Sequence, residues 1–109
     1  MENQALVVYC TCPDQGVAER IAEAVVAERL AACVNLIPGV TSVYRWEGQL
    51  QRDAEWLLII KTRSAVYPQL EARICQLHPY QVPEIIALPI QAGSAAYLDW
   101  IAANTGMSA

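Results

Sequence analysis

Residues 40–63 contain the longest extended pattern in the chain, and a small domain cannot enclose it. Polar and apolar side chains alternate before Gly48, and the run AEWLLIIKTR that follows is typical of a strand buried on both faces. Gly48 and Gln49 supply a turn between the two strands. Each arm of this hairpin has about ten residues and spans roughly 30 Å, whereas a usual strand spans about 17–20 Å. We therefore expect the tip of the hairpin to extend beyond its own domain and to pair with a neighbouring subunit.

A strand and a helix precede this hairpin. The β-branched and apolar run ALVVYCTC predicts a buried strand at residues 5–12. Asp14 is a suitable N-cap for the amphipathic helix that follows, which we expect to end near Ala31. The extended region before the hairpin contains Pro38-Gly39, which indicates a bulge or a bend.

A second helix, a short strand and a terminal helix follow the hairpin. Ser64 is expected to cap the second helix, and Pro79 should end it at His78, because the residue before a proline avoids α geometry. The run EIIALPI predicts the last strand at residues 84–90, and Ser94 is expected to cap the terminal helix. The order is therefore β-α-β-β-α-β with a C-terminal helix. This order predicts an α+β, ferredoxin-like sandwich with both crossover helices on one face of the sheet.

The composition indicates one domain with more apolar surface than it can bury alone. The chain has 109 residues, near the commonest domain size, and we expect residues 1–109 to form a single domain. Hydrophobic residues make up 55% without glycine, against about 45–50% with glycine in typical proteins, so other subunits are expected to cover part of the surface. A net charge of −4 argues against nucleic-acid binding, which usually requires a basic patch.

The sequence also predicts where the protein resides. It has no apolar run of about 18 residues to span a membrane, and its N-terminus lacks the features of a signal peptide. We therefore expect a cytoplasmic protein that does not bind membranes and whose four cysteines are thiols.

Five segments resemble, in order and spacing, the CutA divalent-ion tolerance family. They are LAACVN, SVYRWEG, EWLLIIKT, HPYQVPEII and YLDWI, and the resemblance runs from about residue 6 to residue 101. It implies a homotrimer of ferredoxin-like subunits whose strands continue between subunits, similar in architecture to the PII nitrogen-regulatory trimers. It also implies a role in tolerance to copper and other divalent ions.

The resemblance implies metal binding through cysteine and histidine, at Cys10, Cys33 and His78. Such ligands suit Cu(I) and Zn(II), so copper or another divalent metal is the expected ion, with no cofactor otherwise required. Cys12 carries no support from the family, but it lies two residues from Cys10 on the same face of the strand, where two sulfurs can be presented together. The alternative is that Cys10 and Cys33 are small buried hydrophobic residues, which is the usual role of free cysteines.

His78 is the only histidine, and three roles remain open for it. A histidine in the last turn of a helix is favoured by the helix dipole when charged and can hydrogen-bond the terminal carbonyls. The other two roles are metal ligation and contact with a bound ligand.

A second candidate site is a ligand cleft made of residues that fall in the segments resembling the family. They are Trp46, Glu55, Lys61, Tyr80 and Glu84. Two interpretations remain open. In one, Lys61 and a glutamate only form an ion pair at a subunit boundary; in the other, the group forms an intersubunit pocket with aromatic walls and a few polar groups. By analogy with the PII trimers, Lys61 would meet an anionic ligand and Glu84 a metal ion or an amine.

The sequence does not indicate an enzyme. A Cys33 nucleophile with His78 as its base would need a third group to orient the base, and none is evident. The predicted function is a small cytoplasmic trimer that binds divalent or soft metal ions and confers copper tolerance. The alternatives are a PII-like sensor or scaffold trimer that binds a small metabolite in an intersubunit cleft, and a purely structural trimer.

Overall fold

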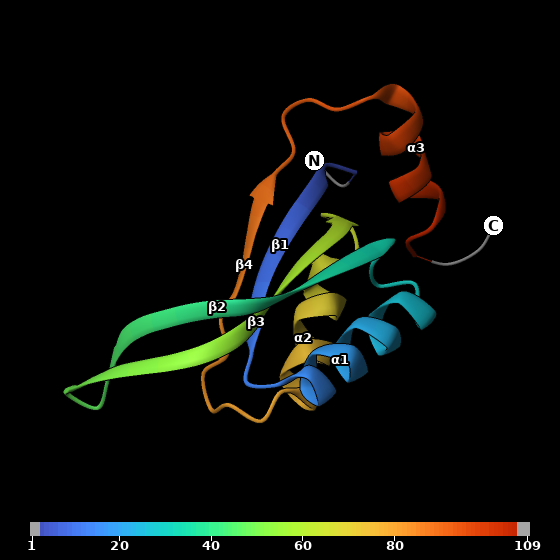
Figure 1. Cartoon of the computed structure of the whole chain (residues 1–109). Helices are drawn as coiled ribbons and strands as arrows, with labels where there is room; N and C mark the ends of the chain where they lie inside the picture. Colours follow the sequence, from blue (N-terminus) through green and yellow to red (C-terminus); the bar gives the residue numbers. More distant parts are fainter. Residues whose placement is uncertain (1–2, 107–109) are drawn as a thin grey trace.

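A four-stranded antiparallel sheet with two helices on one face forms the body of the molecule (Figure 1). The computed structural model describes residues 3–106. Its elements are β1 (Ala5–Cys12), α1 (Gln15–Ala27), β2 (Cys33–Trp46), β3 (Gln49–Arg63), α2 (Tyr67–Leu77), β4 (Ile85–Pro89) and α3 (Ala95–Ala103). The strands lie in the order β2-β3-β1-β4, so the predicted α+β class, element order and ferredoxin-like topology are confirmed.

The hydrophobic core lies between the sheet and the helices α1 and α2. Val8, Cys10 and Cys12 alternate along β1 and are fully buried, because every second side chain of a strand points to the same face. Ile21 of α1 and Ile74 of α2 lie in the same buried cluster. Among residues 3–106, no helix is both long and apolar enough to cross a membrane.

The first helix is capped as predicted but ends earlier than predicted. The Asp14 side chain accepts a 2.9 Å hydrogen bond from the backbone N–H of Val17, which confirms its role as N-cap. The predicted end near Ala31 is wrong, because α1 ends at Ala27. Arg29 has a left-handed φ of 62°, which turns the chain away from the helix axis toward β2.

The second helix ends as predicted but starts later. Its last residue is Leu77, and His78 follows with extended backbone angles, as Pro79 requires. The predicted cap at Ser64 is wrong, because α2 begins at Tyr67 without a side-chain cap. The Ser64 hydroxyl instead accepts a 3.2 Å hydrogen bond from the backbone N–H of Gln4.

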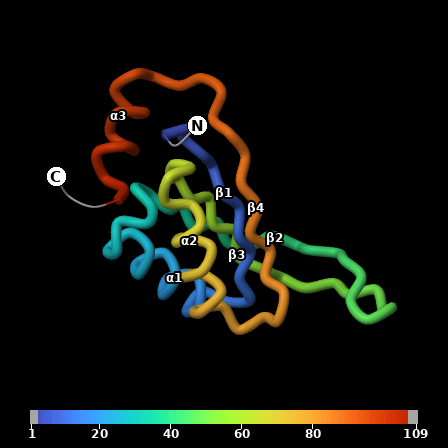
Figure 2. Tube along the Cα trace, turned by 180° about the vertical axis from the view of Figure 1, so that it is seen from behind, coloured from blue at the N-terminus to red at the C-terminus, as the bar shows by residue number. Residues whose placement is uncertain are grey.

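The hairpin formed by β2 and β3 is longer than the sequence predicted. Its strands have 14 and 15 residues, and it projects beyond the rest of a molecule measuring 46 × 25 × 22 Å (Figures 1 and 2). The turn lies at Glu47 and Gly48, one residue earlier than predicted, and both have positive φ as a tight hairpin turn demands. The predicted irregularity at Pro38-Gly39 is confirmed by a shift in strand register between Ile37 and Val40.

The terminal helix α3 lies at the end of the sheet opposite the hairpin tip (Figure 1). The Ser94 hydroxyl accepts a 3.2 Å hydrogen bond from the Tyr97 backbone N–H, which confirms the predicted cap. Two arginines then fix the C-terminal end of the helix. Arg29 donates to the carbonyls of Ala103 and Gly106, and Arg63 donates to the hydroxyl and the carbonyl of Thr105.

Candidate functional site

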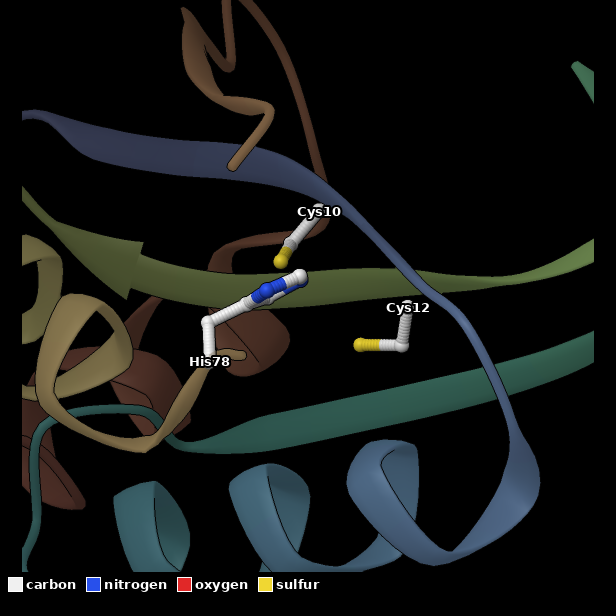
Figure 3. Close-up of side chains that lie close together, drawn as sticks. All are labelled: Cys10, Cys12 and His78. Atoms are coloured by element: carbon white, nitrogen blue, oxygen red, sulfur yellow. The ribbon is translucent and has the colours of Figure 1, made fainter. Parts of the chain in front are cut away.

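Cys10, Cys12 and His78 lie together in the buried interior near the end of β1 (Figure 3). One potential ligand atom from each residue lies within 4.8 Å of the other two. The two cysteines reach the site because they alternate on one face of β1, and His78 reaches it because α2 ends there. Two sulfur ligands of one zinc ion are at most about 4.6 Å apart, so small side-chain rotations would suffice for a shared ion.

His78 already uses both ring nitrogens within the protein. Its Nε2 lies 2.7 Å from the carbonyl oxygen of Thr11, and its Nδ1 lies 3.2 Å from the backbone nitrogen of Tyr80. The Tyr80 N–H must donate to Nδ1, so Nε2 carries the proton and donates to Thr11, and the ring is neutral. His78 thus has a structural role, but not the predicted one. The carbonyl that its ring binds belongs to β1 and not to the end of α2. A metal ion would have to replace one of these two hydrogen bonds.

The two sulfurs of this group affect each other's ionisation. The interaction between the two sulfurs lowers the pKa of Cys12 and, together with burial, raises the pKa of Cys10 well above that of an ordinary thiol. Cys12 is thus the sulfur that ionises first, and Cys10 holds its proton. Because metal binding needs thiolates, an ion bound by both sulfurs would displace the proton of Cys10.

Cys33 lies on the other face of the sheet. Cys10 is opposite Leu58 and Cys33 is opposite Lys61 in the strand register. Leu58 and Lys61 are three residues apart on β3, and side chains an odd number of residues apart point to opposite faces. The structure thus brings Cys10 and His78 together with Cys12, and it places Cys33 elsewhere in the same subunit.

A cleft of about 730 Å³ lies between the hairpin and the segment of residues 79–84. Four of the five predicted cleft residues line it, namely Trp46, Glu55, Tyr80 and Glu84. The Tyr80 hydroxyl donates a 2.8 Å hydrogen bond to the buried Glu55 carboxylate. Burial and this hydrogen bond raise the pKa of Tyr80 above its ordinary value.

Lys61, the fifth predicted residue, is absent from the lining of this cleft. It lies six residues from Glu55 along β3, which corresponds to roughly 20 Å. Its ammonium group donates to the side-chain oxygen of Asn35 and lies 4.0 Å from the Cys33 sulfur. The two charges therefore share a face of the strand, as the sequence pattern indicated, but not a pocket.

Sequence reasoning missed several lining residues. Thr11, Ser42, Val43, Tyr44 and Val82 are among them. Tyr44 and Trp46 are two residues apart on β2, so the alternation that predicted the strand could have placed them on one face. Nothing in the local sequence of Thr11 indicates that residues 79–84 lie beside it.

Comparisons with known proteins identify the family of the chain. The model of the CutA1 divalent ion tolerance protein family matches residues 6–104. The chain belongs to the CutA1 divalent ion tolerance family. Members of the family are tolerance proteins and not enzymes, in agreement with the sequence prediction.

Several CutA proteins resemble the chain in sequence and structure. The divalent-cation tolerance protein CutA of Thermus thermophilus is 55% identical over 100 residues, which are 92% of this chain and 97% of that protein. A solved structure of the Thermus thermophilus protein has a TM-score of 0.92 at 54% identity and covers 94% of this chain and 99% of that one. The human protein CutA is 50% identical over 85% of this chain, which spans about half (52%) of the human protein's length.

Proposed function

We propose that this protein binds a soft or divalent metal ion through Cys10, Cys12 and His78 and contributes in this way to metal tolerance. The observation that carries the proposal is the convergence of these three buried side chains within 4.8 Å. Two sulfurs and one imidazole favour Cu(I) or Zn(II) over Mg(II) or Ca(II), which prefer oxygen ligands. Copper is therefore the first ion to test.

The metal site can be tested by anaerobic titration with Cu(I) in competition with a Cu(I) chelator. We expect one ion per chain, and we expect Cys12→Ser and His78→Ala each to weaken binding by about tenfold or more, as the loss of a ligand does. Cys33→Ser is the matched control, because Cys33 lies on the opposite face of the sheet. A loss of affinity in Cys33→Ser, with none in Cys12→Ser, would contradict this ligand set.

The location and the assembly belong to the same proposal. We place the protein in the cytoplasm as a homotrimer. The location is supported by four cysteines that are all free, among them the adjacent Cys10 and Cys12. Names of relatives place the rice protein in the chloroplast and the Archaeoglobus fulgidus protein in the periplasm, so fractionation of the source cells is the deciding measurement.

The trimer is supported by the projecting hairpin and its exposed apolar side chains.

A second function is binding of a small molecule in the cleft. It is supported by the cleft volume of about 730 Å³, which falls within the about 300–1,000 Å³ typical of small-molecule sites. In the proposed trimer a neighbouring subunit would add to its walls. A thermal-shift screen of small metabolites tests this function, and a screen without any stabilising compound would count against it.

A further inference from the structure

The cleft between the hairpin and residues 79–84 is lined by negative charge without a matching positive charge. Glu55 and Glu84 both line it. None of the described residues that form its walls is a lysine, an arginine or a histidine. Lys61, which would have attracted an anion, lies along the strand beside Asn35.

Glu55 is a buried carboxylate with only part of its hydrogen-bonding capacity used. The residue is 5% exposed, and its Oε2 accepts one hydrogen bond, from Tyr80. Its Oε1 has no hydrogen-bond partner among residues 3–106. Every fully buried side-chain oxygen of those residues has a partner. Oε1 is therefore not fully buried and retains access to the cleft. A buried carboxylate is costly unless its charge is paired. The cleft therefore presents a negative charge that a bound cation would neutralise.

Aromatic side chains form the other part of the walls. Tyr44, Trp46 and Tyr80 all line the cleft, and the faces of aromatic rings attract cations. An anionic ligand would meet the two carboxylates without compensation, and a hard metal ion would gain little from the rings. A positively charged organic group can use both features at once.

We propose that the cleft binds an organic ammonium ion, with Glu55 as its counter-ion and Tyr44, Trp46 and Tyr80 around its apolar part. This inference rests on the second proposed function, small-molecule binding in the cleft, and specifies the charge of the ligand. It replaces the anionic ligand that the sequence led us to expect at Lys61, and it agrees with the amine expected at Glu84.

The test uses three probes of the same shape and different charge, namely benzylammonium, benzyl alcohol and benzoate. Binding is measured calorimetrically on the full chain, in the presence of a metal chelator. We expect benzylammonium to bind about tenfold or more tightly than benzyl alcohol, and benzoate to bind more weakly than either. Glu55→Gln, which keeps the size of the side chain, should reduce the affinity for benzylammonium to that for benzyl alcohol.

The controls separate the charge of the ligand from the existence of the site. Lys61→Ala should leave all three affinities unchanged, because its side chain does not line the cleft. If Glu55→Gln does not fold, Trp46→Leu on the hairpin is the second variant, and it should weaken benzylammonium binding more than benzyl alcohol binding. If benzyl alcohol or benzoate binds as tightly as benzylammonium, the ammonium inference is wrong while cleft binding survives. If none of the probes binds, both are overturned.

Discussion

At the scale of single residues, the segment from His78 to Tyr80 connects the buried sulfur group with the cleft. The His78 ring accepts from the Tyr80 backbone, stacks at a tilt on the Tyr80 ring with centroids 4.7 Å apart, and donates to Thr11. Thr11 and Tyr80 both line the cleft. A metal ion that takes a His78 nitrogen must therefore disturb a residue of the cleft wall. We therefore expect metal binding at His78 to change the cleft, and ligand binding in the cleft to change the metal site.

The hydrogen bond between Tyr80 and Glu55 predicts a loss of stability at alkaline pH. The folded protein holds the Tyr80 proton above the ordinary pKa of 10.0, whereas the unfolded chain releases it near that value. The stabilisation is thus complete below pH 10 and is lost as the pH rises further. In Tyr80→Phe we expect a cost of about 1.5–3 kcal/mol at neutral pH, because a hydrogen bond to a charged group is removed.

Urea unfolding at pH about 8 and about 11 measures this effect. The wild-type protein should lose more free energy of unfolding between these two values than Tyr80→Phe loses. The raised pKa of Cys10 acts in the same direction but is common to both proteins, so the difference isolates Tyr80. Equal losses in the two proteins would show that the hydroxyl is not held as described.

At the scale of secondary-structure elements, the C-terminal end of α3 is fixed by side chains from distant segments. Arg63 of β3 binds both the hydroxyl and the carbonyl of Thr105, and the Gly106 N–H donates a 2.8 Å hydrogen bond to the Arg29 carbonyl. Gly106 has a φ of 81°, and a Cβ there would collide with the Arg63 guanidinium. Position 106 thus favours glycine for two separate reasons, its backbone conformation and the space that Arg63 occupies.

Gly106→Ala and Gly39→Ala form a matched pair that separates these reasons. Both glycines have nearly the same φ, 81° and 82°, but a Cβ at Gly39 would meet no atom within 4 Å. We expect Gly39→Ala to cost about 1–2 kcal/mol from backbone strain alone, and Gly106→Ala to cost more because Arg63 must move. Denaturant unfolding gives both values. Equal costs would mean that the contacts of Arg63 with Thr105 contribute nothing to stability.

At the scale of the whole molecule, the surface is more apolar than an isolated subunit requires. Val43 and Leu50 on the hairpin are 56% and 74% exposed, and Ile86 and Leu88 on β4 are 50% and 47% exposed. The hairpin and β4 are separate parts of the same subunit, so both could be covered in a closed ring of identical chains. This pattern supports the proposed trimer with strand pairing between subunits.

Sedimentation should therefore give about three times the chain mass of 12.0 kDa. We expect Val43→Asp with Leu50→Asp to shift the protein toward monomer, because each change would bury a carboxylate in the interface. Gln69→Asp, on the exposed side of α2, is the control and should leave the mass unchanged. A wild-type monomer would refute both the trimer and the interpretation of the hairpin.

The sequence by itself determined the elements whose signals are local. Asp14 and Ser94 cap helices through their own side chains, and Pro79 ends α2 by sterics with its neighbour, so these were predictable. The end of α1 and the start of α2 were not, because Arg29 and Ser64 are held by distant partners, Gly106 and Gln4. Helix propensity depends only on the local sequence and does not reflect such contacts.

The candidate sites divide in the same way. Strand periodicity placed Cys10 and Cys12 on one face, and the family resemblance pointed to His78, but only the fold, which places His78 beside Thr11 of β1, brought the three together. Equally, periodicity placed Glu55 and Lys61 on one face of β3, and only the position of residues 79–84 decided that Glu55 enters the cleft and Lys61 does not. A repeat along a strand fixes the face of a side chain. What lies opposite that face depends on the fold.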